Sequence, residues 1–191
     1  MNFHLLITLF SLLSTQITYG KSPCFSVSNK DITVGWTAFK TPAKAGVKGV
    51  LPKVNYTGKN ELTSIESIIE NASLTIDTNS IATKNAARDK KISSYFFGNM
   101  KKGMIMTAKV KSLSKKYLKI AITANGETKV VPMTYKLSGG KLTASGYLDV
   151  LDFAMGKSLA AINKACFALH EGKTWSDVKI NLEVNIAKCS K

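Results

Sequence analysis

The sequence predicts a mainly β fold, a single eight-stranded antiparallel β-barrel with two or three short helices packed on it. Several segments alternate strictly between apolar and polar residues, which is the pattern of half-buried strands. Glycine-containing turns join two consecutive pairs of these segments, as antiparallel hairpins require. Two further stretches break the alternation and follow helical spacing instead.

The strands are expected in eight segments. In chain order these are residues 32–38, 47–56, 72–79, 104–111, 118–123, 131–137, 142–150 and 178–186. The last is the clearest, because Val178, Ile180 and Leu182 alternate with polar residues. Asn125-Gly126 and Ser138-Gly139-Gly140 can adopt the positive φ angles of tight hairpins. Eight strands are enough to close a barrel with room for side chains or one ligand.

Helices are expected at residues 83–97, entered through Thr83 and Asn85, and at residues 155–170. In the second helix an apolar stripe at helical spacing can lie against the barrel; it consists of Leu159, Ile162, Cys166 and Leu169. A weaker helical turn is expected at residues 64–70. We find no linker, low-complexity tract or internal repeat.

The N-terminus resembles a secretory signal peptide. An apolar run from Leu5 to Leu13 is followed by small and polar residues up to Gly20. The alternative is a membrane anchor, but the apolar run is shorter than the ~20 residues that a spanning helix needs. We therefore expect residues 1–20 to be cleaved and residues 21–191 to form one periplasmic or secreted domain.

The charge is strongly basic, with 27 Lys and Arg against 12 Asp and Glu. Nucleic-acid binding is disfavoured, because Arg88 is the lone arginine and no basic cluster interleaved with aromatic residues occurs. We expect a lysine-rich, solvated surface with at most a weak, transient attraction to anionic lipid headgroups at a membrane.

Groups for catalysis are scarce, and we expect neither an enzyme nor a cofactor. Once residues 1–20 are removed, His170 is the only histidine; a capping role at a helix end, as a cation facing the last carbonyls, is favoured over catalysis. No His or Cys pair has metal-ligand spacing, so no metal is expected. Asp149 and Asp152 are expected to serve a turn or the surface.

Three cysteines in an exported chain predict one disulfide and one leftover thiol. In a closed eight-stranded barrel the first and last strands pair, which brings Cys24 near Cys189. This topology favours a Cys24–Cys189 disulfide, with Cys166 as a buried thiol. A Cys24–Cys166 disulfide is the alternative.

The predicted interior mixes large and very small side chains. The large ones are Trp36, Met104, Met106, Leu118, Tyr135 and Leu148, and the small ones are Ala38, Ala108, Ala144 and Gly146. Small inward residues can leave a dry cavity suited to an apolar ligand. By pattern alone, a packed core in which small and large residues interdigitate is the favoured interpretation.

A resemblance to a known family changes that balance. Residues 74–98 contain a strand ending in Asp77-Thr78, a helix with an Asn85–Arg88–Asp89 run, and the pair Phe96-Phe97. This segment is similar to the central signature of the YceI-like family, with Tyr95 where Asp is usual. Residues 34–49, 146–153 and 161–178 are similar to family members as well.

The resemblance implies an elongated, lipocalin-like barrel whose apolar interior holds a polyisoprenoid lipid, such as a quinone or prenyl phosphate, without enzymatic activity. The interior residues named above, together with Ile120, would then contact the ligand. Phe96, Phe97 and Trp175 would line the mouth or anchor the helices. Arg88 would meet a phosphate headgroup, although an ion pair with Asp77 or Asp89 is the favoured role. The alternative function is a packed barrel that acts as an envelope stress or protein-interaction module.

Overall fold

The computed structural model describes residues 22–189, so the predicted signal peptide lies outside the described residues. The main sheet has nine antiparallel strands. They are β2 (Ile32–Lys40), β3 (Ala45–Leu51), β4 (Val54–Tyr56), β5 (Ser73–Asp77), β6 (Ile105–Leu113), β7 (Tyr117–Ala124), β8 (Glu127–Ser138), β9 (Lys141–Asp149) and β10 (Thr174–Asn185). The mainly β prediction is confirmed.

The predicted closed barrel of eight strands is not confirmed, because the sheet has nine strands. The order is β3-β2-β10-β9-β8-β7-β6-β5-β4, so that β3 and β4 are the two ends of the sheet. The segment predicted as one strand over 47–56 is divided at Pro52 and Lys53. Proline has no N–H to donate to a strand ladder, and this accounts for the division.

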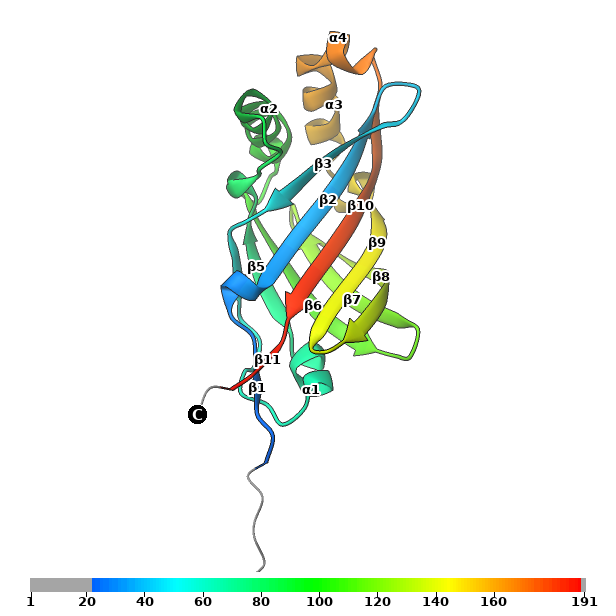
Figure 1. Ribbon diagram of the computed structural model, residues 1–191. Helices are drawn as coiled ribbons and strands as arrows, with labels where there is room; N and C mark the ends of the chain where they lie inside the picture. The colour runs from blue at the N-terminus through cyan, green and yellow to red at the C-terminus, as the bar shows by residue number, and fades with distance from the viewer. Residues whose placement is uncertain (1–21, 190–191) are drawn as a thin grey trace, which may run out of the picture.

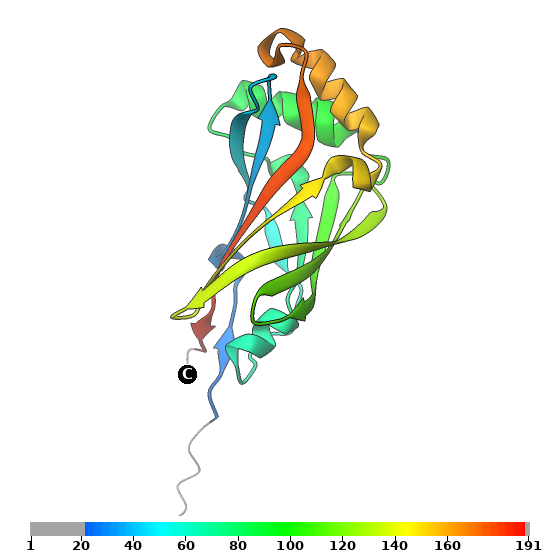
Figure 2. The same ribbon diagram turned by 90° about the vertical axis from the view of Figure 1, so that its right-hand side faces the viewer.

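The sheet is nevertheless strongly curled, because its two end strands are consecutive in the chain (Figures 1 and 2). Val50 on β3 exchanges two backbone hydrogen bonds, of 2.9 and 3.0 Å, with Ala82 just beyond β5. Asp77 N–H also donates to the carbonyl of Lys53 at 3.0 Å. These contacts hold the two ends of the sheet together around a common interior.

Both predicted hairpin turns are confirmed. Asn125 and Gly126, between β7 and β8, have φ of 54° and 89°. Gly139 and Gly140, between β8 and β9, have φ of 57° and 81°. A Cβ atom on Gly140 would lie 2.5 Å from the carbonyl oxygen of Ile186, so this turn requires glycine sterically as well.

The helices gather at the two ends of the sheet. They are α1 (Ile65–Glu70), α2 (Ala86–Lys91), α3 (Gly156–Ala165) and α4 (Phe167–His170). Short helical turns, η3 (Ile92–Phe96) and η4 (Phe97–Asn99), continue α2, and η5 (Val150–Phe153) precedes α3. Figures 1 and 2 place α2, α3 and α4 at one end and α1 at the other. No helix within residues 22–189 is long and apolar enough to span a membrane.

The helix boundaries agree closely with the local signals. Ser64 caps α1 by accepting from the Ser67 N–H at 3.0 Å. Asn85, rather than Thr83, caps α2, accepting from the Arg88 N–H at 2.9 Å. The helix predicted over residues 155–170 is divided into α3 and α4 at Cys166.

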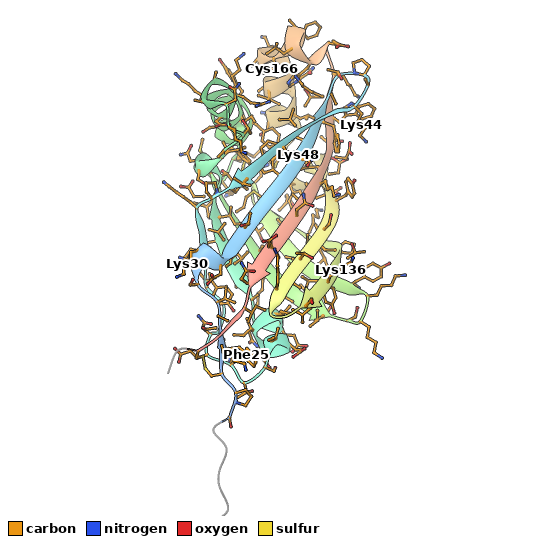
Figure 3. The ribbon with its side chains drawn as sticks, viewed as in Figure 1. Phe25, Lys30, Lys44, Lys48, Lys136 and Cys166 are labelled. Atoms are coloured by element: carbon orange, nitrogen blue, oxygen red, sulfur yellow. A yellow bond between two sulfur atoms is a disulfide. The ribbon has the colours of Figure 1, made fainter. Side chains whose placement is uncertain are left out.

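The disulfide prediction is confirmed. Cys24 and Cys189 are bonded, with Cα atoms 5.3 Å apart, beside a two-stranded sheet of β1 (Phe25–Ser26) and β11 (Ala187–Lys188). Cys166 is a buried free thiol, so the alternative Cys24–Cys166 pairing is wrong. Figure 3 shows Phe25 near the bonded termini and Cys166 at the opposite end of the molecule.

Candidate functional site: an apolar cavity

The interior of the curled sheet contains a cavity of about 440 Å³ whose walls are almost entirely apolar. Side chains from β2, β3 and from β5 to β10 line it, together with side chains of α2, α3, α4 and the short helical turns η3, η4 and η5. Towards α1 the interior is much more densely filled: Ile68, Ile69 and Leu118 are at most 2 % exposed there and border a void of only about 40 Å³. The cavity therefore has a filled floor near α1 and lies towards the end that carries α2, α3 and α4.

Six of the predicted interior residues line this cavity. They are Trp36, Ala38, Met106, Ala108, Ile120 and Leu148. All of them lie on the inward face that the alternation predicted. The predicted inward direction of these strands is therefore correct.

The other five predicted interior residues do not line the cavity; they are Met104, Leu118, Tyr135, Ala144 and Gly146. Leu118 is fully buried in the packed floor. Tyr135 donates its hydroxyl to the carbonyl of Ser114 at 2.7 Å. A Cβ atom on Gly146 would lie 2.7 Å from the Pro132 carbonyl oxygen, so Gly146 provides room for a neighbouring strand rather than for a ligand.

Met104 and Ala144 also lie away from the cavity, each for a different reason. Met104 precedes β6, and its carbonyl accepts from both the N–H and the hydroxyl of Thr78, at 2.9 and 2.6 Å. Ala144 is buried on β9, where it pairs with Tyr135 of β8 and does not reach the cavity. Alternation identifies the inward face of a strand, but it does not show how far along the interior the core is filled.

The predicted stripe on residues 155–170 forms one wall of the cavity. Its four members, Leu159, Ile162, Cys166 and Leu169, all line the space. The helical spacing predicted that this stripe would lie against the barrel. It did not predict that the helix stands away from the sheet and leaves a void between them.

All four predicted mouth residues, Arg88, Phe96, Phe97 and Trp175, line the cavity. The rings of Phe96 and Phe97 pack edge to face with centroids 5.2 Å apart. Trp175 donates its indole N–H to the carbonyl of Thr41 at 2.9 Å. These aromatic side chains therefore both line the cavity and hold its helical rim in place.

Arg88 does not form the predicted ion pair with Asp77 or Asp89. Its Nε donates to the Thr83 hydroxyl at 2.9 Å, and that hydroxyl donates to the Asp89 carboxylate. Asp77 instead lies 3.9 Å from the Lys53 ammonium. Arg88 and Asp89 are thus coupled through the buried Thr83, and the guanidinium remains at the cavity wall.

His170 lies in the last turn of α4, at a helix end as predicted, but the predicted cationic form is disfavoured. Burial lowers the pKa of the imidazole, and the positive charges of Lys40 and Lys91 lower it further. The helix α4 ends at Glu171 and Gly172, whose φ angles are 50° and 74°.

A hydrogen-bond chain assigns the protons of His170. The Asn163 amide nitrogen donates to the Gly172 carbonyl at 3.1 Å, so the Asn163 oxygen accepts from the Thr174 hydroxyl at 2.8 Å. The single hydroxyl proton of Thr174 is then used, and His170 Nδ1, 2.7 Å away, must donate to it. Nε2 is therefore the unprotonated nitrogen of the neutral ring.

No acidic side chain borders the cavity among the described residues; the basic side chains that do so are three cations and one histidine. They are Lys40, Arg88, Lys91 and His170. Lys40 and Lys91 had no distinguishing signal in the sequence, because they are two of many lysines. No group of three or more His, Cys, Asp or Glu side chains in the described part of the chain could hold a metal ion.

Aspartates 149 and 152 serve a turn, as predicted. Asp149 accepts from the Leu151 N–H at 2.8 Å and from the Ser176 hydroxyl at 2.8 Å. These contacts begin η5 and attach it to β10. The Asp149 carboxylate therefore has a structural role at the rim, and Asp152 lies within the turn itself.

Comparison with known proteins identifies similar sequences and folds. The family model of the YceI-like domain matches residues 25–186. No curated protein matches the chain. Among solved structures, a polyisoprenoid binding domain from Saccharophagus degradans, implicated in plant cell wall breakdown, is 12% identical, with a TM-score of 0.62 over 87% of this chain and 98% of that chain.

Two further structures share the fold. Burkholderia cenocepacia BcnA is 16% identical, with a TM-score of 0.55 over 84% of this chain and 99% of that chain. The Campylobacter jejuni YCEI protein is 17% identical, with a TM-score of 0.53 over 100% of both chains. At these identities the likeness establishes a common architecture.

Proposed function

Because the chain belongs to the YceI-like domain family, we propose that residues 21–191 form a non-enzymatic carrier that holds an isoprenoid-type lipid in the apolar cavity. The observation that carries the proposal is the cavity of about 440 Å³ inside the curled sheet. A solved structure of the same fold is described as a polyisoprenoid binding domain, which supports a prenyl chain as the ligand.

The walls suit a flexible hydrocarbon chain. Burial of apolar ligand surface is worth about 25 cal/mol per Å², which offsets the loss of chain freedom on binding. The wall residues offer few polar groups, and those at the rim are largely engaged with one another, as in the chain from His170 to Asn163. An apolar chain inside and a polar headgroup at the rim match this division.

The rim favours a headgroup with negative charge or strong acceptor atoms. Arg88, Lys91 and Lys40 border the cavity without any neighbouring carboxylate in its wall. Cations that are partly removed from water are stabilised by an opposite charge. The contact that brings the lipid to this rim would be a transient one with a membrane surface.

The disulfide supports an exported protein. Disulfides persist in oxidising compartments such as the periplasm or the exterior of the cell, and Cys24 and Cys189 are bonded. We therefore propose that residues 21–191 act in the periplasm or outside the cell, after removal of residues 1–20 as a signal peptide.

The second hypothesis, a packed barrel that acts as an envelope stress or interaction module, predicts a filled interior. A cavity of this size favours the carrier, because protein interiors otherwise pack with few voids larger than a water molecule.

Native mass spectrometry of residues 21–191 purified from a bacterial envelope tests the proposal, with organic extraction of the bound material. Ala108 and Ala38 line the cavity, so Ala108→Phe and Ala38→Phe should fill it and abolish the co-purified lipid. Ala121 lies on β7 between the inward residues Ile120 and Ile122 and faces outward, so Ala121→Phe is the matched control.

We expect stoichiometric prenyl lipid on the wild type and on Ala121→Phe, and none on folded Ala108→Phe. A wild type that carries no lipid and ignores added quinone and prenyl phosphate would overturn the carrier function. Equal lipid on Ala108→Phe and Ala121→Phe would show that the cavity is not the site.

A further inference from the structure

The four-residue helix α4 carries the two most exposed large apolar side chains in the described part of the protein. Phe167 is 64 % exposed and Leu169 is 62 % exposed. Single exposed apolar residues are ordinary on a protein surface. Two of them in one short helix at the tip of the molecule form an apolar projection. Contact with water does not stabilise such a projection, which is more typical of a binding surface.

This projection is continuous with the cavity. Leu169 and His170 border the cavity, as does Cys166, the residue that precedes Phe167. The Phe167 ring packs beside Gly172, where a Cβ atom would lie 3.2 Å from the ring. The helix therefore extends the apolar wall of the cavity onto the outer surface.

The projection is held firmly by the strands beneath it. Lys40 on β2 donates to the Leu169 carbonyl at 3.2 Å. Thr41 N–H donates to the Lys173 carbonyl at 3.0 Å, and the Thr41 carbonyl accepts from Trp175 at 2.9 Å. The apolar tip is thus a fixed part of the rim.

Lysines surround the tip. Lys44 and Lys173 lie over the ring of Trp175, with ammonium-to-centroid distances of 4.8 and 4.5 Å. Lys40 and Lys164 add two more positive charges. Segments 40–44 and 164–173 contain these four lysines and one carboxylate, Glu171, so that positive charge is in excess there, although Asp177 pairs with Lys44 at 2.9 Å.

The end that bears α4 lies opposite the first and last strands of the described chain. Figures 1 and 2 place α4 and the turn between β2 and β3 at one end, and β1 and β11 at the other. Figure 3 shows Lys44 and Cys166 at the same end as α4. A flat partner can approach this end along the long axis of the molecule.

We propose that α4, with the lysines of the adjoining 40–44 and 164–173 segments, docks the protein on an anionic lipid membrane. This inference rests on the proposed function as a lipid carrier, since docking would set the cavity rim against the bilayer. Apolar side chains that insert among headgroups, surrounded by lysines, are the features by which peripheral proteins bind anionic membranes. Trp175 between two lysines suits the same boundary.

Vesicle sedimentation tests the inference. Residues 21–191 are mixed with vesicles of phosphatidylcholine and phosphatidylglycerol, or of phosphatidylcholine alone. Phe167→Ser removes an exposed ring that lies outside the cavity wall. Tyr147→Ser is the matched control, because Tyr147 is an aromatic residue of β9 that is 58 % exposed.

We expect the wild type and Tyr147→Ser to bind the anionic vesicles, more weakly as salt is raised, and not the neutral ones. Phe167→Ser should bind the anionic vesicles about tenfold more weakly. Phe167→Trp should restore binding and show a blue-shifted indole emission on the vesicles. Equal binding of Phe167→Ser and Tyr147→Ser, or no binding by the wild type, would overturn docking through α4.

Native mass spectrometry on the same samples separates this inference from the proposed function. If Phe167→Ser carries lipid and binds vesicles as tightly as the wild type does, the docking surface is rejected and the proposed carrier function stands. Vesicle binding that depends on Phe167, in a protein that never carries lipid, would support the docking surface and reject the carrier.

Discussion

At the scale of single residues, His170 shows how the rim controls charge. Its Nδ1 proton is committed to Thr174, and its neutral form is favoured by burial and by Lys40 and Lys91. A neutral ring with an unprotonated Nε2 can accept a hydrogen bond from a headgroup. It can also become a cation when an anion arrives and offsets the two lysines.

We predict a pKa for His170 below the usual 6.5, measured by NMR titration of residues 21–191, in which it is the only histidine. The folded state binds this proton less readily than the unfolded state. The contribution of neutral His170 to the free energy of unfolding is therefore fully present above pH 6.5, and it is lost as the pH falls through the lowered pKa. Lys91→Gln should raise the pKa. A value at or above 6.5 in the ligand-free protein would contradict this account.

At the scale of elements, the turn between β7 and β8 connects the sheet to the helical rim. Asn125 is 8 % exposed, and its side-chain oxygen accepts from the Lys101 N–H at 2.6 Å. Its side-chain nitrogen donates to the carbonyls of Phe153 and Ala154 at 2.9 and 3.1 Å. One turn residue thus holds η5, which leads into α3 and the cavity wall.

Asn125→Gly should lower the free energy of unfolding by about 2–3 kcal/mol, because it keeps the positive φ but leaves buried backbone groups without partners. Urea denaturation measures this change. Lys84→Gly is the control, since Lys84 is exposed and has a φ of 61°; it should change stability by less than about 1 kcal/mol. Similar losses in both variants would mean that the Asn125 side chain contributes little.

At the scale of the whole molecule, the two ends have separate tasks. The end near α1 is packed and carries the disulfide, whereas the end near α4 holds the cavity and its rim (Figure 1). The Cys24–Cys189 bond spans 165 positions, so it closes nearly the whole described chain into one loop. Stability can therefore be supplied far from the part that must admit a ligand.

Replacing both bonded cysteines, Cys24→Ser with Cys189→Ser, should lower the free energy of unfolding by about 3–5 kcal/mol, as loop closure of this length predicts. Guanidinium denaturation of both proteins measures the difference. Reduction of the wild type should lower its free energy of unfolding by the same amount. In Cys166→Ala, the free energies of unfolding of the reduced and oxidised proteins should still differ by this amount. An unchanged midpoint in the double variant would show that the bond is not a source of stability.

The lipid bound by the double variant should match that of the wild type, because neither Cys24 nor Cys189 lies at the cavity.

Much of the architecture was determined by the sequence alone, because the signals are local. Alternation with period two marks inward faces such as that of Met106 and Ala108, and Asn125-Gly126 marks a hairpin through its φ angles. The family resemblance and the placement of Cys24 near Cys189 also followed from the order of motifs and strands. The tertiary structure alone decided where the interior is empty: Ala38 and Ala108 face the cavity, whereas the equally small Ala144 and Gly146 pack against neighbouring strands. The reason is physical, since a void depends on how far strands and helices from distant parts of the chain stand apart, and no local pattern records that distance.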